Sequence, residues 1–143
     1  MAKPDSTLLD PGRFPFRTEA DIRFGDIDVN RHVNNVSIAN FVEEGRVRFH
    51  QASGFHVALA GLGAMAVSVA IEFVGQAFYP GTMTIHAGAL RIGTSSYDLE
   101  LLLVQDGRPV ALARSTMVCT RDGKPFPIPD HFRASVQDWM VRS

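Results

Sequence analysis

The sequence has only one cysteine and almost no net charge. Cys119 has no second cysteine with which to form an internal disulfide, which is typical of a protein in a reducing compartment such as the cytoplasm. The formal net charge is −1 over 143 residues. A chain so nearly neutral provides no general field to attract nucleic acid, so a nucleic-acid-binding function is disfavoured.

Export and membrane signals are also missing. The N-terminal stretch MAKPDSTLLDPGRFPFR holds three prolines and no long apolar core, and it predicts an extended arm over residues 1–17. The run HVALAGLGAMAVSVAIEFV is about as long as a membrane span, but His56 and Glu72 lie near its ends and glycines interrupt it. From Met65 its apolar residues alternate to position 73, which predicts a loop followed by a buried strand over 65–78. We therefore expect no contact with membranes.

Signatures of other hydrolases and of metal sites are missing as well. Without a G-x-S-x-G segment, a serine hydrolase would lack its nucleophile elbow. Four of the five histidines are scattered without metal-ligand spacing, namely His50, His56, His86 and His131. We therefore expect no metal or other cofactor. Cys119 lies in an alternating apolar segment and is expected to be a buried thiol rather than a nucleophile.

The pattern that is present predicts one long helix in a chain of strands. Apolar residues spaced i, i+3, i+4, i+7 and i+11 predict an amphipathic helix over 36–51, and they are Ile38, Phe41, Val42, Gly45 and Phe49. Asn34 or Asn35 is the expected N-cap, and Gly54 the expected stop.

Strands are expected around this helix, at 20–25, with Ile22 and Phe24 facing inward, and at 65–78, 82–92, 97–105 and 110–120. Tight turns between the later strands indicate antiparallel neighbours. A short helix capped by Asp130 is expected within 129–143. The class is therefore α+β, in a single domain over 1–143.

One polar segment, DIDVNRHVNN at 26–35, lies between the first strand and the helix. The start of a helix supplies unpaired backbone N–H groups and the positive end of the helix dipole, which can polarise a carbonyl group. Asp28 beside it could activate water or attack directly, with Asn30 and His32 close in sequence. The alternative is that these side chains only cap the helix and tie down the turn. Asp26 could equally belong to the site or hold the turn.

This segment, followed by EEGRV at 43–47, resembles the signature of the hotdog-fold acyl thioesterases. It is most similar to the D-x-D-x-x-x-H-V-N-N branch of the 4-hydroxybenzoyl-CoA thioesterase-like family, and also to acyl-carrier-protein thioesterases. The resemblance implies an antiparallel sheet wrapped around one long central helix. It also implies a homodimer or a dimer of dimers with each site at a subunit interface.

The resemblance assigns roles within the segment. Asp28 matches the catalytic carboxylate, acting as general base or as nucleophile, with Asn30 and His32 as its polar partners. The backbone N–H of Asn35 matches the group that polarises the thioester carbonyl. Val33 and Asn34, in the same motif, are expected to contact the substrate.

Further substrate contacts are expected outside the segment. Glu44 matches an acid in the family's helix, although an ion pair with Arg48 is an alternative. Arg91, Ser95 and Ser96 follow a strand end and could meet the pantetheine or phosphates of coenzyme A, or form a solvated hairpin. Ile38 stands where the family usually has tyrosine, which suggests a more apolar cavity.

The implied activity is hydrolysis of an acyl thioester, of coenzyme A or possibly of acyl carrier protein. One alternative is hydration of an enoyl thioester, whose D-x-N-P-x-H segment is approached by residues 28–32 without the proline. Another is a non-catalytic acyl-thioester binding protein. The acyl group cannot be read from the sequence, because a pocket is assembled from distant residues.

Overall fold

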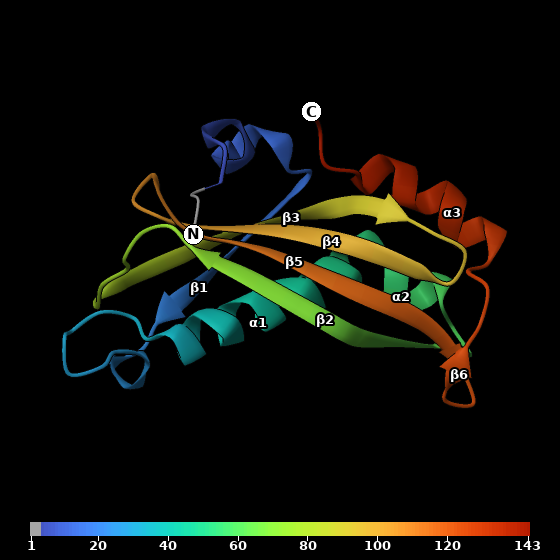
Figure 1. Ribbon diagram of the computed structural model, residues 1–143, viewed down its shortest axis with the longest axis horizontal. Helices are drawn as coiled ribbons and strands as arrows, with labels where there is room; N and C mark the ends of the chain where they lie inside the picture. The colour runs from blue at the N-terminus through green and yellow to red at the C-terminus, as the bar shows by residue number, and fades with distance from the viewer. Residues whose placement is uncertain (1–3) are drawn as a thin grey trace.

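The centre of the protein is one curved antiparallel sheet, seen in a computed structural model that describes residues 4–143 (Figure 1). Its main strands lie in the order β1-β3-β4-β5-β2, with a short β6 pairing to β5. Their bounds are β1 Phe16–Ile22, β2 Gly63–Phe73, β3 Gly81–Ile92, β4 Ser96–Gln105, β5 Arg108–Arg121 and β6 Lys124–Pro125. The sheet curls around helix α1, which confirms the predicted α+β, hotdog class.

Helix α1, Asn35–Ser53, begins and ends at residues whose local chemistry requires it. The side chain of Asn34 accepts the backbone N–H of Ser37 at 2.8 Å, so Asn34 rather than Asn35 is the N-cap. Gly54 adopts φ 77°, a left-handed conformation that ends the helix as predicted. The helix therefore exceeds the predicted 36–51 by one residue at its start and two at its end.

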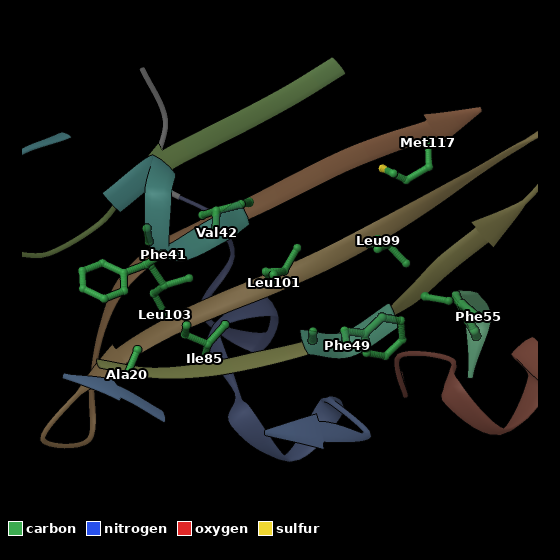
Figure 2. Close-up of a cluster of buried hydrophobic side chains, with 14 of the residues drawn as sticks. Ala20, Phe41, Val42, Phe49, Phe55, Ile85, Leu99, Leu101, Leu103 and Met117 are labelled. Carbon is green, nitrogen blue, oxygen red and sulfur yellow. The ribbon is translucent and has the colours of Figure 1, made fainter. Parts of the chain in front are cut away.

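The apolar stripe of α1 packs on the concave face of the sheet (Figure 2). Phe49 is fully buried and Val42 nearly so, against leucines that alternate along β4. Burying side chains of this size contributes about 1.5–3 kcal/mol each. At Gly45 a Cβ atom would overlap the Ile85 side chain, so glycine is what allows this close approach of helix and sheet.

Strand β2 differs from the buried strand predicted over 65–78. It is an edge strand whose side chains are nearly all exposed, because β5 covers only one of its edges and no helix covers its faces fully. A bulge between Ala66 and Ser68 adds one residue to β2. Met65 therefore pairs with Val118 and Val69 with Ser115, so four residue steps on β2 match only three on β5. The predicted single apolar face is therefore wrong, since the bulge turns Met65 to the opposite side.

The first strand also differs from the prediction. β1 runs Phe16–Ile22, and a 3-10 helix at Phe24–Asp26 follows, so Phe24 is exposed rather than inward-facing. The arm predicted over 1–17 is not extended throughout its described part. It forms 3-10 helices at Ser6–Leu9 and Pro11–Arg13, and its residues 1–3 lie outside the described ones.

Two short helices complete the fold, α2 Phe55–Ala58 and α3 Asp130–Val136. Asp130 is the first residue of α3 rather than its cap, because Pro129 occupies the cap position. None of the helices within residues 4–143 has both the length and the apolar character needed to cross a membrane.

Candidate active site

A tight hairpin turn places Asp28 just before the start of α1. Ile27 and Val33 form an antiparallel bridge, and the backbone N–H of Asp28 donates to the carbonyl of His32 at 3.0 Å. Arg31 closes the turn with φ 63°, and its N–H donates to the carbonyl of Asp28 at 2.9 Å. The polar segment is therefore a fixed turn, as a site that must hold a carboxylate requires.

The carboxylate of Asp28 is exposed and only partly occupied. Its Oδ1 accepts the backbone N–H of Asn30 at 2.8 Å, and residues 4–143 offer it no other hydrogen bond. One oxygen is thus oriented by the turn, which leaves Oδ2 available to a water molecule or a substrate.

A hollow of about 390 Å³ lies between this turn, the start of α1 and the loop that follows β2. Its wall includes Asp28, His32, Val33, Asn35, Ile38 and Gly75. Ile38 is almost completely buried and gives the hollow an apolar wall at its position. Asp28 and Asn35 also line a second hollow of about 500 Å³, which adjoins the first.

The start of α1 lies beside both hollows, because Asn35 lines the two of them and Val36 lines the second. Asn34 satisfies the N–H of Ser37 with its side chain and that of Ile38 with its carbonyl. The N–H groups of Asn35 and Val36 have no partner within the helix, and they lie at its positive end. A carbonyl oxygen placed there would be polarised, because the donors and the dipole favour negative charge.

Asp26 stabilises the turn through hydrogen bonds to residues on either side of it. It is buried, and its Oδ2 accepts the backbone N–H of Arg23 at 2.8 Å, while its carbonyl accepts the N–H of Asn34 at 2.9 Å. Burial opposes ionisation, but hydrogen bonds from Arg23 and Ser37 and the guanidinium charge outweigh it and lower the pKa of Asp26. Of the two roles left open for Asp26, the contacts favour the structural one.

The structure brings some of the predicted residues together. Asp28, His32, Val33 and Asn35 line the same hollow. The ring of His32 packs edge-on against Phe78, with ring centroids 5.3 Å apart.

Other predicted residues have different surroundings. The amide oxygen of Asn34 is occupied by the cap. The exposed Asn30 approaches Asp28 through its backbone N–H and does not line the hollow. Glu44 forms an ion pair with Arg48 at 3.3 Å and lines a separate polar hollow between β1 and α1.

Arg91, Ser95 and Ser96 are far from Asp28 within the chain. The Asp28 turn lies at the Gly81 end of β3, because Ile22 pairs with Gly81. Arg91 is ten residues further along the strand, roughly 33 Å at 3.3 Å per residue. There it forms an ion pair with Asp98 at 3.0 Å and a hydrogen bond to Ser96 at 3.1 Å.

One part of the hollow was missed in the sequence, the loop after β2. The N–H groups of Val74 and Gly75 both donate to the carbonyl of Val110, which folds the loop over the hollow, and the N–H of Val33 donates to Ala77. A Cβ at Gly75 would overlap the carbonyl of Pro109. A glycine inside a predicted strand was the available signal for such a close approach.

The remaining reactive side chains do not form a second centre. Cys119 is buried, as predicted, and burial raises the pKa of its thiol. Within the described part of the chain, no three His, Cys, Asp or Glu side chains are grouped so as to hold a metal ion.

Comparison with known proteins gives one family and many similar structures. The family described as the thioesterase-like superfamily matches residues 22–136. No curated protein sequence matches the chain. A protein of Bacillus stearothermophilus described as a predicted thioesterase is 25% identical, with a TM-score of 0.80 over 90% of this chain and 98% of that one.

Two further structures share the fold. A thioesterase of Thermus thermophilus, complexed with coenzyme A and Zn, is 23% identical, with a TM-score of 0.78 over 87% of this chain and 94% of that one. A 1,4-dihydroxy-2-naphthoyl-CoA thioesterase of Synechocystis is 14% identical, with a TM-score of 0.74 over 86% of this chain and 96% of that one.

Proposed function

Because the chain belongs to the thioesterase-like superfamily, we propose that it hydrolyses acyl-coenzyme A thioesters in the hollow beside Asp28. The observation that carries this proposal is that a carboxylate and the start of a 19-residue helix line one hollow. Thioester hydrolysis needs these two parts, a base or nucleophile and a group that stabilises the oxyanion.

The reaction follows from this arrangement. The thioester carbonyl accepts a hydrogen bond from the N–H of Asn35, and Asp28 removes a proton from a water molecule as its oxygen attacks the carbonyl carbon. The C–S bond of the tetrahedral intermediate then breaks, the thiolate takes the proton from Asp28, and the free acid remains. In the alternative route Asp28 attacks the carbonyl carbon itself and the C–S bond breaks to release the thiolate; water then hydrolyses the resulting anhydride to the free acid and restores Asp28.

Coenzyme A is the proposed carrier of the acyl group, with acyl carrier protein as the alternative. The Thermus thermophilus thioesterase of the same fold was crystallised with coenzyme A.

The proposed working form is a dimer in which two copies of β2 pair antiparallel about a two-fold axis. Within residues 4–143 neither edge strand of the sheet has a strand on its outer side, but the two edges differ in charge. β1 exposes Arg17, Glu19 and Asp21, which protect an edge from further pairing, whereas β2 has no charged residue from Gly63 to Ile71. An uncharged strand can meet its own copy without repulsion.

This dimer also gives a role to the distant substrate-binding residues. Antiparallel pairing places the Gly63 end of one β2 beside the Phe73 end of the other. Since Met65 and Ser96 both pair with Val118, the Ser95–Ser96 end of one sheet approaches the Asp28 hollow of the second copy. Arg91 and the two serines could then contact coenzyme A across the interface.

Thiol release from a panel of acyl-CoA esters, by the wild type and Asp28→Asn, tests the proposal. We expect the substitution to abolish turnover while circular dichroism and ligand binding stay unchanged. Asp106→Asn, an exposed position in the β4–β5 turn, is the matched control and should keep full activity. Near-normal turnover by Asp28→Asn would disprove the assigned role.

The same panel separates the alternatives when it includes crotonyl-CoA. Loss of the conjugated absorbance without free thiol would identify a hydratase. Binding with no change to any thioester after long incubation would identify a binding protein.

A further inference from the structure

Another hollow, of about 430 Å³, lies between α1 and β2 at the end of the sheet away from Asp28. We call it the α1–β2 hollow, and the residues of its wall that matter here are Arg46, His50, His56, Leu59, Ala66 and Met117. Its walls combine an apolar surface with a few polar side chains, as is usual for a site that binds a small organic group. The mechanism above leaves this hollow unused.

Arg46 is the unusual member of this wall. Its side chain is only 14% exposed, yet its one ion-pair partner in residues 4–143 is Glu43 at 4.0 Å, whose side chain is 66% exposed. No hydrogen bond from the guanidinium to any described residue accompanies this contact. The Arg46 side chain is thus largely covered by protein, while its N–H groups remain free to bind, so the α1–β2 hollow that it lines is where an acceptor would be bound.

The neighbouring histidine is not available as that acceptor. Nε2 of His50 lies 3.0 Å from the phenolic oxygen of Tyr97, and burial, followed by the charge of Arg46, lowers the pKa of His50 to about 4. His50 is therefore neutral at physiological pH, and it cannot balance the charge of Arg46.

The α1–β2 hollow reaches the catalytic turn only across the proposed dimer interface. Within one chain, Ala64 of its wall and Phe73 beside Asp28 lie nine residues apart on β2, roughly 30 Å at 3.3 Å per residue. In an antiparallel pair of β2 strands these two ends lie side by side, and paired strands are only about 4.8 Å apart. Each α1–β2 hollow then adjoins the Asp28 hollow of the other copy.

We propose that the α1–β2 hollow receives the far end of the acyl group bound at the other copy's Asp28, and that Arg46 selects acyl groups ending in a carboxylate. The proposal rests on the proposed function and its dimer. A distal carboxylate would form charge-assisted, bidentate hydrogen bonds with the guanidinium, whereas a methyl end would displace water from the cation and offer it no acceptor. The substrate class is therefore an acyl-CoA with an anionic end, such as the CoA monoester of a dicarboxylic acid.

The first test compares adipoyl-CoA with hexanoyl-CoA, which have the same chain length and differ in the terminal group. We expect the wild type to have the higher kcat/KM for adipoyl-CoA. Arg46→Met should shift the adipoyl-to-hexanoyl ratio toward hexanoyl by roughly 10- to 100-fold, as loss of a charged hydrogen-bond pair implies. Arg46→Lys should keep part of the preference, and Arg17→Met on exposed β1 should keep all of it. An unchanged ratio in Arg46→Met would overturn the proposal.

A mixing experiment tests the interface. Dimers of one Asp28→Asn copy and one Arg46→Met copy hold one complete site only if Asp28 and Arg46 act from different chains. We expect these mixed dimers to recover the wild-type ratio at half the wild-type rate per dimer. If the mixed dimers instead show the adipoyl-to-hexanoyl ratio of the Arg46→Met homodimer, both residues act within one chain, contrary to the proposal.

Calorimetric binding separates this inference from the proposed function. If the wild type releases thiol from no ester of the acyl-CoA panel, hydrolysis is refuted, and binding of adipoyl-CoA and hexanoyl-CoA still decides the role of Arg46. Tighter binding of adipoyl-CoA that is lost in Arg46→Met supports it, and equal affinities overturn it.

Discussion

Nε2 of His50 lies 3.0 Å from the phenolic oxygen of Tyr97, which joins the last turn of α1 to the start of β4. Burial raises the pKa of Tyr97, so the phenol keeps its proton and shares a hydrogen bond with the neutral imidazole. Phe55 packs on both rings and so covers one side of the pair.

This pair predicts a loss of stability in mild acid. The pKa of His50 falls from its ordinary 6.5 to about 4 on folding, so the unfolded chain binds the proton more tightly. The stabilising contribution is full above pH 6.5 and is lost as the pH falls toward 4, by up to about 3 kcal/mol. Thermal unfolding followed from pH 7.5 to pH 4 measures this.

His50→Gln is the control for that measurement, because glutamine can replace the imidazole in the hydrogen bond to Tyr97 without titrating. It should flatten the pH dependence of the melting temperature. A weaker slope should remain, since burial, with Arg17 nearby, also lowers the pKa of His86. An unchanged slope in His50→Gln would contradict the assignment.

Gly45 predicts an unusual response to alanine in the middle of a helix. Alanine normally stabilises a helix by about 1 kcal/mol relative to glycine. At position 45 the added methyl would overlap the Ile85 side chain, and such overpacking costs about 1–3 kcal/mol. Urea unfolding should show Gly45→Ala to be less stable than the wild type. Asn40→Ala, at an exposed position of α1, should be at least as stable as the wild type, and a stabilised Gly45→Ala would refute the close-packing argument.

The uncharged β2 edge predicts that one added charge will separate the proposed dimer. Val69 is 47% exposed near the middle of the strand, so Val69→Lys would place two ammonium groups close together at the two-fold axis. Sedimentation velocity should give a dimer for the wild type and a monomer for Val69→Lys. Glu19→Lys on the β1 edge should leave the dimer intact. Equal masses for Val69→Lys and the wild type would show that β2 is not the interface.

The features that could be predicted from the sequence are those set by local chemistry. Helix α1 was predicted closely because its cap at Asn34, its apolar spacing and its stop at Gly54 lie within one continuous segment. The Asp28 turn was predicted as a candidate site for the same reason, although the catalytic role remains a prediction.

The features that were missed depend on contacts between distant segments. The bulge in β2 is defined only by its pairing with β5, so alternation alone placed Met65 on the wrong face. The loop over the hollow depends on the carbonyl of Val110, more than thirty residues away in sequence. Likewise, Arg91 could not be placed relative to Asp28 until the direction of β3 was known.

The unequal rims of the sheet bear on how large an assembly can grow. A molecule that could pair through both outer strands of its sheet would add copies indefinitely and form a fibre. Here the charged strand β1 resists the addition of another copy. A two-fold contact through the uncharged strand β2 would occupy the pairing edge of both molecules at once. Growth along the hydrogen-bonding direction would then stop at two copies, and any larger particle would have to form through the faces of the sheets.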